Sequence, residues 1–153
     1  MKHLYSEGNN GMEIRKVTSQ KERDDAIYVR MIVFVKEQHV PEDEELDQYD
    51  ETAIHFVGYV QDEPVAASRL RYVDEYGKLE RICVRKEFRG KHFGKMLMEE
   101  MERQLQQDGY MKAKLNAQTH AIGFYEDQGY EKLSENVFMD AGIPHVAMIK
   151  EFE

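Results

Sequence analysis

The chain has 153 residues, of which 41% are hydrophobic, and this length and composition fit one compact domain. It carries 21 basic and 30 acidic side chains, for a formal net charge of -9 with histidine neutral. Because nucleic-acid binding draws on clustered Lys and Arg, the charge argues against a general nucleic-acid binder and mildly favours a cationic partner.

Neither a membrane anchor nor an export signal is expected. No apolar run approaches the roughly 20 residues that a bilayer-spanning helix needs, and the first residues lack the apolar segment of a signal peptide. Cys83 is the only cysteine, so no intramolecular disulfide can form. We therefore expect a cytoplasmic protein, with residues 1–11 as a flexible leader or an engineered remnant and residues 12–153 as a single domain.

The first half of the chain predicts one helix among several strands. Residues 13–17 alternate polar and apolar side chains, as a half-buried strand does. Ser19, with Glu22 three residues later, forms a capping-box pattern, which predicts a helix that begins there and ends near Val35. Three further strands of an antiparallel meander are expected at residues 54–60, 65–73 and 78–84.

The second half predicts two helices and three strands. One face of a long helix carries apolar side chains at spacings of three and four, namely Phe93, Met96, Leu97, Met101 and Leu105. The later elements are a strand at 111–116, a helix around 121–125 closed by Gly129, and strands near 130–133 and 146–152. This order predicts an α/β (α+β) fold with a mixed, mostly antiparallel sheet and helices on both faces.

A turn rich in glycine and cations joins the third meander strand to the long helix. The first-turn amides of a helix are unpaired donors at the positive end of its dipole, so a phosphate placed there is stabilised. Gly90 and Gly94 let the backbone approach a ligand, and Arg89, Lys91 and Lys95 add positive charge. We expect this turn to hold a pyrophosphate or a 3'-phosphate.

Two other phosphate-binding motifs fail to match the same segment. Three residues rather than four separate Gly90 from Gly94, and Met96 stands where a P-loop has the Ser or Thr that binds magnesium. The three-glycine fingerprint of dinucleotide-binding folds is also missing. Nucleoside triphosphatase and dinucleotide-dependent activities are therefore disfavoured.

Residues 89–94, Arg-Gly-Lys-His-Phe-Gly, resemble the cofactor motif of the GNAT superfamily of acetyl-CoA-dependent N-acetyltransferases, which reads Arg or Gln, two residues, Gly, one residue, Gly or Ala. His92 stands at the first motif glycine. A residue with a Cβ there would either narrow the pyrophosphate turn or require an uncomfortable backbone angle.

A second segment, residues 118–130, resembles the family's Asn-x-x-Ala-x-x-Phe-Tyr-x-x-x-Gly-Phe motif, with Gln118 in place of Asn. Residues 33–38 and 142–145 resemble the ElaA-like branch of the superfamily. The resemblance implies acetyl-CoA as cosubstrate and direct attack of an acceptor amine on the thioester, without an acyl-enzyme. It also implies a set of cofactor-binding residues: Ile82, Cys83, Val84, Arg89, Gly90, Lys91, His92, Phe93, Gly94, Lys95, Gln118, Phe124 and Tyr125.

Three residues are candidates for proton transfer. Tyr125 matches the family tyrosine beside the CoA sulfur, and a phenol can donate a proton or a hydrogen bond while neutral at pH 7. Glu80 is a candidate base, directly or through water, or else the partner of a neighbouring arginine. His145 is an alternative base or lines the acceptor pocket.

The acceptor side is less well defined. By branch resemblance, Glu37 and Gln38 contribute polar contacts to the acceptor. The acidic segment 41–51 is either a rim that attracts a cationic amine or a solvated loop. The six histidines show no metal-site spacing, so no metal is expected. We expect a monomer or a homodimer, and the alternative to an enzyme is a non-catalytic acyl-CoA sensor.

Overall fold

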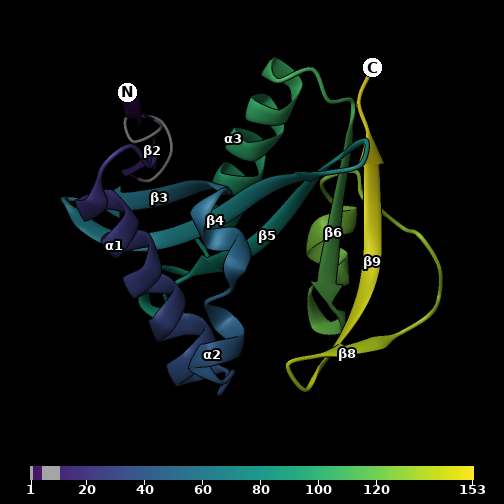
Figure 1. Cartoon of the computed structure of the whole chain (residues 1–153), viewed down its shortest axis with the longest axis horizontal. Helices are drawn as coiled ribbons and strands as arrows, with labels where there is room; N and C mark the ends of the chain where they lie inside the picture. The colour runs from purple at the N-terminus through teal and green to yellow at the C-terminus, as the bar shows by residue number, and fades with distance from the viewer. Residues whose placement is uncertain (1, 5–10) are drawn as a thin grey trace.

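The computed structural model describes residues 2–4 and 11–153. Its strands form one nine-stranded sheet in the order β1-β2-β3-β4-β5-β6-β9-β7, with β8 paired to β9 (Figure 1). The strands are β1 (Lys2–Leu4), β2 (Met12–Lys16), β3 (Ile54–Val60), β4 (Glu63–Val73), β5 (Tyr76–Val84), β6 (Lys112–Gln118), β7 (Glu131–Lys132), β8 (Phe138–Asp140) and β9 (Ile143–Glu151).

The helices are of three kinds. The α-helices are α1 (Gln20–Arg30), α2 (Glu42–Glu45), α3 (Phe93–Gln107) and α4 (Ile122–Glu126). A π-helix, η1 (Met31–Glu37), continues α1, and the 3-10 turns are η2 (Gln48–Glu51), η3 (Lys86–Phe88) and η4 (Thr119–Ala121). None of the helices within residues 2–4 and 11–153 is long and apolar enough to cross a membrane.

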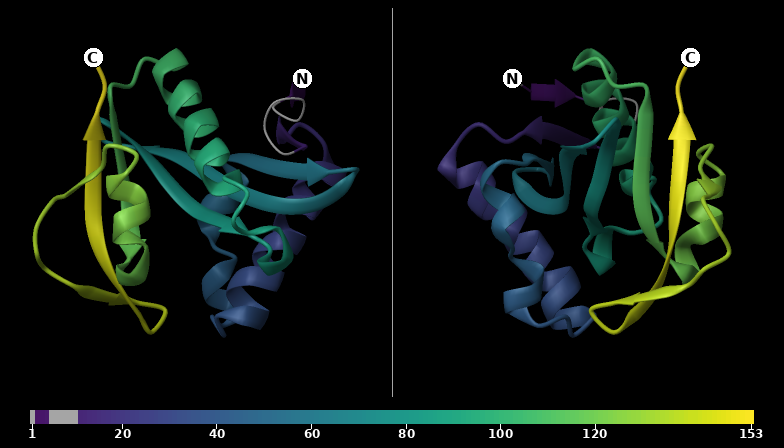
Figure 2. Two further views of the ribbon diagram at one scale, coloured as in Figure 1. Left: turned by 180° about the vertical axis from the view of Figure 1, so that it is seen from behind. Right: turned by 45° about the vertical axis from the view of Figure 1, so that its right-hand side comes forward.

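The sheet divides between β5 and β6, its only parallel neighbours among the described strands. All other pairs are antiparallel, whereas β5 and β6 pair only at Gly77 with Ala113 and Lys78 with Lys114. Beyond these pairs the two strands diverge, and Figures 1 and 2 show the resulting fork between two halves of the sheet. The facing edges of β5 and β6 are therefore left without a strand partner in the fork.

Helices cover both faces of the sheet, as the sequence predicts. The apolar face of α3 packs with Phe56, Ala66 and Leu79 in the larger core, whereas α1 packs with their neighbours Val57 and Ala67 in a second core. Successive residues of a strand point to opposite faces, so the two cores lie on opposite sides of β3 and β4. Seen from behind in Figure 2, α3 crosses the face opposite α1.

The helix starts follow the predicted signals. The hydroxyl of Ser19 caps α1 by accepting a hydrogen bond of 3.2 Å from the Glu22 amide, although the Glu22 carboxylate bonds the Thr18 amide rather than completing the box at Ser19. His92 precedes α3 with φ 66°, in the left-handed region. The uncomfortable angle expected at this motif position is confirmed.

Several elements differ from the prediction. The first helical segment continues past the predicted end near Val35 to Glu37, because α1 runs on into η1. The acidic segment contains α2 and η2 instead of a plain loop. β8 has no predicted counterpart, since a strand of three residues leaves almost no periodicity to detect. Within the expected leader, Lys2–Leu4 form β1 beside β2, while residues 1 and 5–10 lie outside the described part of the chain.

Candidate active site

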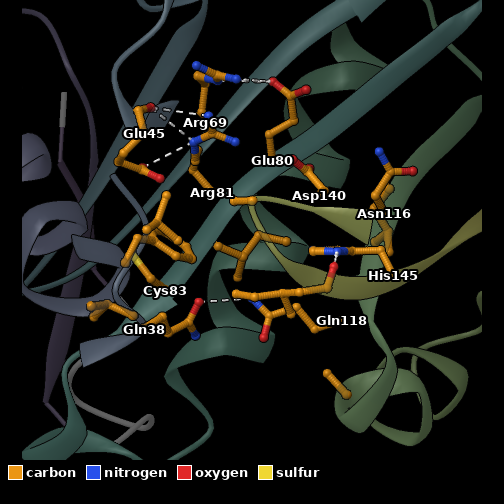
Figure 3. Close-up of a pocket in the computed structure, with 18 of the residues that line it drawn as sticks. Gln38, Glu45, Arg69, Glu80, Arg81, Cys83, Asn116, Gln118, Asp140 and His145 are labelled. Carbon is orange, nitrogen blue, oxygen red and sulfur yellow. Dashed lines mark hydrogen bonds and ion pairs between the residues drawn. The ribbon is translucent and has the colours of Figure 1, made fainter. Parts of the chain in front are cut away.

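A pocket of about 720 Å³ lies where β5 and β6 diverge. Its lining comes from elements far apart in the sequence: the end of η1, the segment around α2, the facing parts of β4, β5 and β6, and the start of β9 (Figure 3). At a point where a sheet splits, both backbone groups and side chains can line a ligand site.

The edge of β5 presents backbone donors to this pocket. The Arg85 amide donates to Val65 O on β4 at 2.8 Å. Because amides alternate in direction along a strand, those of Ile82 and Val84 point the other way, toward β6. No β6 residue pairs with them there. These amides are therefore available to a ligand, while the side chains of Ile82 and Val84 pack against the larger core.

A bulge in β5 sets which side chains enter the pocket. The register shifts between Ala67 with Cys83 and Arg69 with Glu80, and Arg81 has φ 57° at this point. The extra residue puts Glu80 and Cys83 on the same face although they are three apart. The side chain of Arg81 donates to Glu45 O at 3.1 Å, which holds the bulge in place.

The start of α3 lies close to the second motif. No side chain of the described residues caps this helix, and Gly94 comes so near Phe124 that a Cβ there would lie 3.3 Å from the Phe124 ring. Gly90, with φ 82°, has no atom within 4 Å of a Cβ position. The uncapped turn is thus open in front of the helix, next to the Phe124 ring.

Arg89 is held by two chain contacts instead of standing free. Its Nε donates to Val84 O at 2.8 Å, and its two terminal nitrogens donate to the Glu37 carboxylate at 2.7 Å each. The predicted cofactor and acceptor residues, Arg89 and Glu37, are therefore joined to each other. The pair lowers the pKa of Glu37, mainly through the Arg89 hydrogen bonds.

Tyr125 lines the pocket from α4. Its ring contacts Phe124 and Tyr130 edge to face, with centroids 5.0 and 6.3 Å apart. Among the described residues none hydrogen-bonds to its hydroxyl, and burial raises its pKa to about 12. The group is a neutral donor at physiological pH with its hydrogen bond unused by the rest of the described chain.

His145 enters the pocket from β9. Its Nδ1 lies 2.7 Å from Ile143 O, and its ring stacks on Phe138 with centroids 5.9 Å apart. Since a carbonyl oxygen only accepts, Nδ1 carries the proton of the neutral ring and Nε2 keeps a lone pair. No residue within 2–4 and 11–153 bonds Nε2, and Figure 3 shows the ring extending into the pocket.

Glu80 is engaged by cations. Its Oε1 accepts from Arg69 Nη2 at 2.7 Å and from Arg71 Nε at 2.9 Å, while Lys78 Nζ lies 3.4 Å from Oε2. Burial alone would raise its pKa, but the ion pairs with Arg71 and Arg69 outweigh burial and lower it. The geometry is that of the ion-pair alternative predicted for Glu80.

Carboxylates of the acidic segment form ion pairs with two buried arginines. Arg30 bonds Glu45 and Asp50, and Arg69 bonds Asp47 and Asp50, at 2.7 to 2.8 Å. Both arginine side chains are about 1% exposed. These three acidic residues therefore neutralise internal cations, and neither the predicted rim for a cationic amine nor a fully solvated loop describes them.

Gln118 joins the two arms of the fork. Its Nε2 donates to Gln38 Oε1 at 3.0 Å (Figure 3), and its Oε1 lies 2.7 Å from His120 Nε2. The link connects the end of η1 to the end of β6 across the pocket. Its amide is thus already paired at the position predicted to bind cofactor.

A family model described as an acetyltransferase (GNAT) domain matches residues 17–152. The chain belongs to the GNAT acetyltransferases. YjcF of Bacillus subtilis (strain 168), named an uncharacterized N-acetyltransferase, is 47% identical over 133 residues, which cover 87% of this chain and 95% of that protein.

Solved structures agree with this membership. Escherichia coli ElaA has a TM-score of 0.82 at 26% identity, covering 92% of this chain and 99% of its own, in agreement with the predicted branch. A GNAT family acetyltransferase from Elizabethkingia anophelis with acetyl-CoA bound shares the fold, with a TM-score of 0.72 at 14% identity over 94% of this chain and 99% of its own. The protein is an acetyltransferase enzyme of the GNAT fold.

In this GNAT acetyltransferase, the pocket brings together only some of the predicted residues. Those that line it are Glu37, Gln38, Glu80, Ile82, Cys83, Val84, Arg89, Gln118, Tyr125 and His145. Residues 90–95 and Phe124 lie outside its lining, and the Phe93 side chain is buried in the larger core. Cys83 is also a core residue, with its Sγ 3.6 Å from Ala67 O and its pKa raised to about 12 by burial.

The pocket also contains residues that the sequence did not single out. They are Tyr49, Arg69, Arg71, Asn116 and Asp140, from the acidic segment, β4, β6 and β8. None belongs to a recognisable motif. Arg69 and Arg71 do alternate with apolar neighbours on β4, which was the one available signal that two charges share a strand face.

Proposed function

We propose that this enzyme transfers the acetyl group of acetyl-CoA to a primary amine by direct attack, with His145 as the base and Tyr125 as the donor to the departing sulfur. The observation that carries the proposal is that His145 Nε2 and the Tyr125 hydroxyl, neither bonded by any residue that the structure describes, belong to side chains of one pocket. A base and a donor on opposite sides of a reacting carbonyl are what aminolysis of a thioester needs.

Acetyl-CoA would lie in the fork between β5 and β6. The amides of Ile82 and Val84 would bond the pantetheine arm, and the uncapped start of α3, with the turn from Arg89 to Lys95, would hold the pyrophosphate. An amide at the same edge would also stabilise the oxyanion of the tetrahedral intermediate. The membership of the family and the open β5 edge support this placement.

The proton steps follow from the ordinary pKa values. An alkylammonium group has a pKa near 10.4, so the acceptor first loses one proton to solvent; the neutral amine then attacks, and His145 Nε2 accepts the second proton as the nitrogen becomes an amide. The C–N bond forms, the C–S bond breaks, and CoA leaves as a thiol with an ordinary pKa of about 8.5. Because Tyr125, at about 12, is the weaker acid, it stabilises the developing thiolate by a hydrogen bond while the proton comes from the imidazolium or solvent.

Glu80 has a different place in this proposal. A base role for it, direct or through water, stays a prediction. Its contacts with Arg69, Arg71 and Lys78 favour the ionised carboxylate and make it a weaker base than a neutral imidazole. We assign Glu80 to holding the guanidinium groups of β4 in place.

The sensor alternative has one observation in its favour. Gln118 and Arg89 are bonded to Gln38 and Glu37, so both would have to change partners to bind the cofactor. Release of CoA thiol from acetyl-CoA, measured across a panel of primary amines with mass spectrometry of the products, separates the two functions. Acceptor-dependent release supports the enzyme, whereas saturable acetyl-CoA binding without release for any amine supports the sensor.

A further inference from the structure

We propose that the acceptor amine also carries a carboxylate, and that Arg71 binds this carboxylate. The inference rests on the proposed function, because it names the class of acceptor for the same pocket. Arg71 lines the pocket from β4. No sequence motif draws attention to it, and its role follows from the contacts of its guanidinium group.

The guanidinium of Arg71 is held rigidly from two sides. Its Nε donates to Glu80 Oε1 at 2.9 Å, and its Cζ lies 3.8 Å from the centre of the Tyr49 ring. Its two terminal nitrogens have no partner among the residues that the structure describes. The side chain is 19% exposed, so its terminal N–H groups are accessible from the pocket. The contacts with Glu80 and Tyr49 fix their direction.

The neighbouring buried arginines, Arg69 and Arg30, use their terminal guanidinium nitrogens for contacts within the protein. Arg69 donates through both terminal nitrogens to Asp47, and Arg30 donates through its own to Asp50 and to Glu45 O. Arg71 alone in this cluster, within the described residues, keeps both terminal nitrogens for something else. Unused donors on an immobilised side chain are a preformed site, because little rotamer entropy remains to be lost on binding.

The charge of the cluster points the same way. Its connected ion pairs join five cations, Arg30, Arg69, Arg71, Lys78 and Arg81, to four carboxylates, Glu45, Asp47, Asp50 and Glu80. Arg71 and Lys78, which stand opposite each other in the β4–β5 register, share the single carboxylate of Glu80, so the excess positive charge lies at this end of the network. A cationic or purely apolar acceptor would leave this charge unpaired.

The geometry of the Arg71 guanidinium favours a carboxylate as its ligand. Two parallel N–H groups match the two oxygens of a carboxylate, and each such charge-assisted bond is stronger than a neutral one. His145 lines the same pocket from β9 and would face the amine, so the acceptor would carry its amine and its carboxylate at separate ends. A phosphate presents similar oxygens, and the test separates the two.

The test uses matched acceptors that differ in the anionic group only. The pairs are 4-aminobutyrate with butylamine, β-alanine with propylamine, and phosphoethanolamine with ethanolamine. For the wild type we expect a higher kcat/KM for each carboxylate member than for its neutral partner. In R71Q the carboxylate members should lose roughly 10- to 100-fold, mainly through KM, while the neutral members stay unchanged. R103Q, outside the pocket on α3, is the matched control.

Three results would overturn the proposal: equal kcat/KM within each carboxylate pair, an R71Q loss shared by neutral and anionic amines, or a preference for phosphoethanolamine alone. R71K retains the charge without the fork and should recover part of the loss; circular dichroism and acetyl-CoA affinity check that the variants fold. If no amine is turned over, the proposed function fails separately, and calorimetry on the CoA-saturated enzyme then decides. Carboxylate binding lost in R71Q supports the Arg71 site, and binding independent of Arg71, or none, overturns it.

Discussion

Arg89 and Glu37 hold each other through two hydrogen bonds of 2.7 Å, joining the end of η1 to the turn before α3. The family resemblance assigns these two residues to different ligands, Arg89 to the cofactor and Glu37 to the acceptor. Their pairing would bring the two proposed binding regions together at one contact. A substitution at either residue should therefore affect the binding of both the cofactor and the acceptor.

Substitution of Arg89 by Ala should weaken acetyl-CoA binding about tenfold, the worth of roughly one charge-assisted hydrogen bond. The stability of the fold should fall by less than about 1 kcal/mol, because both side chains of the pair are more than a third exposed or close to it. Titration calorimetry with acetyl-CoA measures the first effect and urea denaturation the second. E37Q, which leaves the guanidinium intact, should retain most of the affinity; a larger loss in E37Q than in R89A would contradict this assignment.

His92 offers a test of backbone strain, because its φ of 66° suits glycine better than any residue with a Cβ. H92G should unfold with a free energy up to about 1 kcal/mol higher than H92A, since the left-handed angle costs Ala about 1–2 kcal/mol and the larger entropy of glycine in the unfolded chain offsets part of this gain. Urea denaturation of the two variants gives the difference directly. Equal stabilities, or a more stable H92A, would show that the angle is not imposed on the folded protein.

Much of the fold was accessible from the sequence. The Ser19 cap, the apolar stripe of α3 and the strands expected at residues 54–60, 65–73 and 78–84 are local signals, and the structure confirms them. The divergence of β5 from β6 is not a local signal. Local pattern cannot show it, because the number of residues over which two distant strands pair depends on the whole sheet.

The site was less accessible than the fold. Tyr125 and His145 were singled out and both line the pocket. The buried network was missed, because residues 41–51 look like a solvated acidic loop until Arg30 and Arg69, distant in sequence, are placed against them. Burial and partner choice are tertiary properties, and the contacts of Glu80 with Arg69 and Arg71 could not be read from the sequence.

Substitution of Tyr125 by Phe should lower kcat roughly 100-fold while acetyl-CoA affinity stays nearly unchanged, because only a hydrogen bond that strengthens in the transition state is lost. Burial raises the pKa of Tyr125 to about 12, so the phenol stays protonated and the wild type should show no loss of activity from tyrosine ionisation up to about pH 10. Steady-state kinetics with a CoA-thiol readout test both statements. Y28F, on α1 outside the pocket lining, is the control, and an unchanged kcat in Y125F would reject the assignment.

The acid stability of the protein should depend on the network around Glu80. The folded-state pKa values of Glu80, Asp47 and Asp50 are lowered by their arginine partners, so their contribution is complete above the ordinary values of 4.5 and 3.8 and is lost as pH falls through the lowered ones. Glu45 acts in the opposite sense, because burial raises its pKa, and it offsets part of this loss.

E80Q tests the sign of this dependence. At pH 7 the variant should unfold with a free energy about 3 kcal/mol below the wild type, because its arginine partners lose a buried counter-charge. The gap should narrow as the pH is lowered below 4.5, where the wild-type carboxylate also becomes neutral. Urea denaturation between pH 7 and pH 3 measures it, with E99Q, on the exposed side of α3, as the control. A gap that widens toward acid would reverse the sign argued here.

The most direct test of the proposed mechanism is a crystal structure of the enzyme with CoA. We expect the pantetheine arm in the fork between β5 and β6, bonded to the amides of Ile82 and Val84, with the sulfur within hydrogen-bond distance of the Tyr125 hydroxyl. The pyrophosphate should lie at the first turn of α3. CoA bound outside the fork, or with its sulfur far from Tyr125 and His145, would contradict the proposed mechanism.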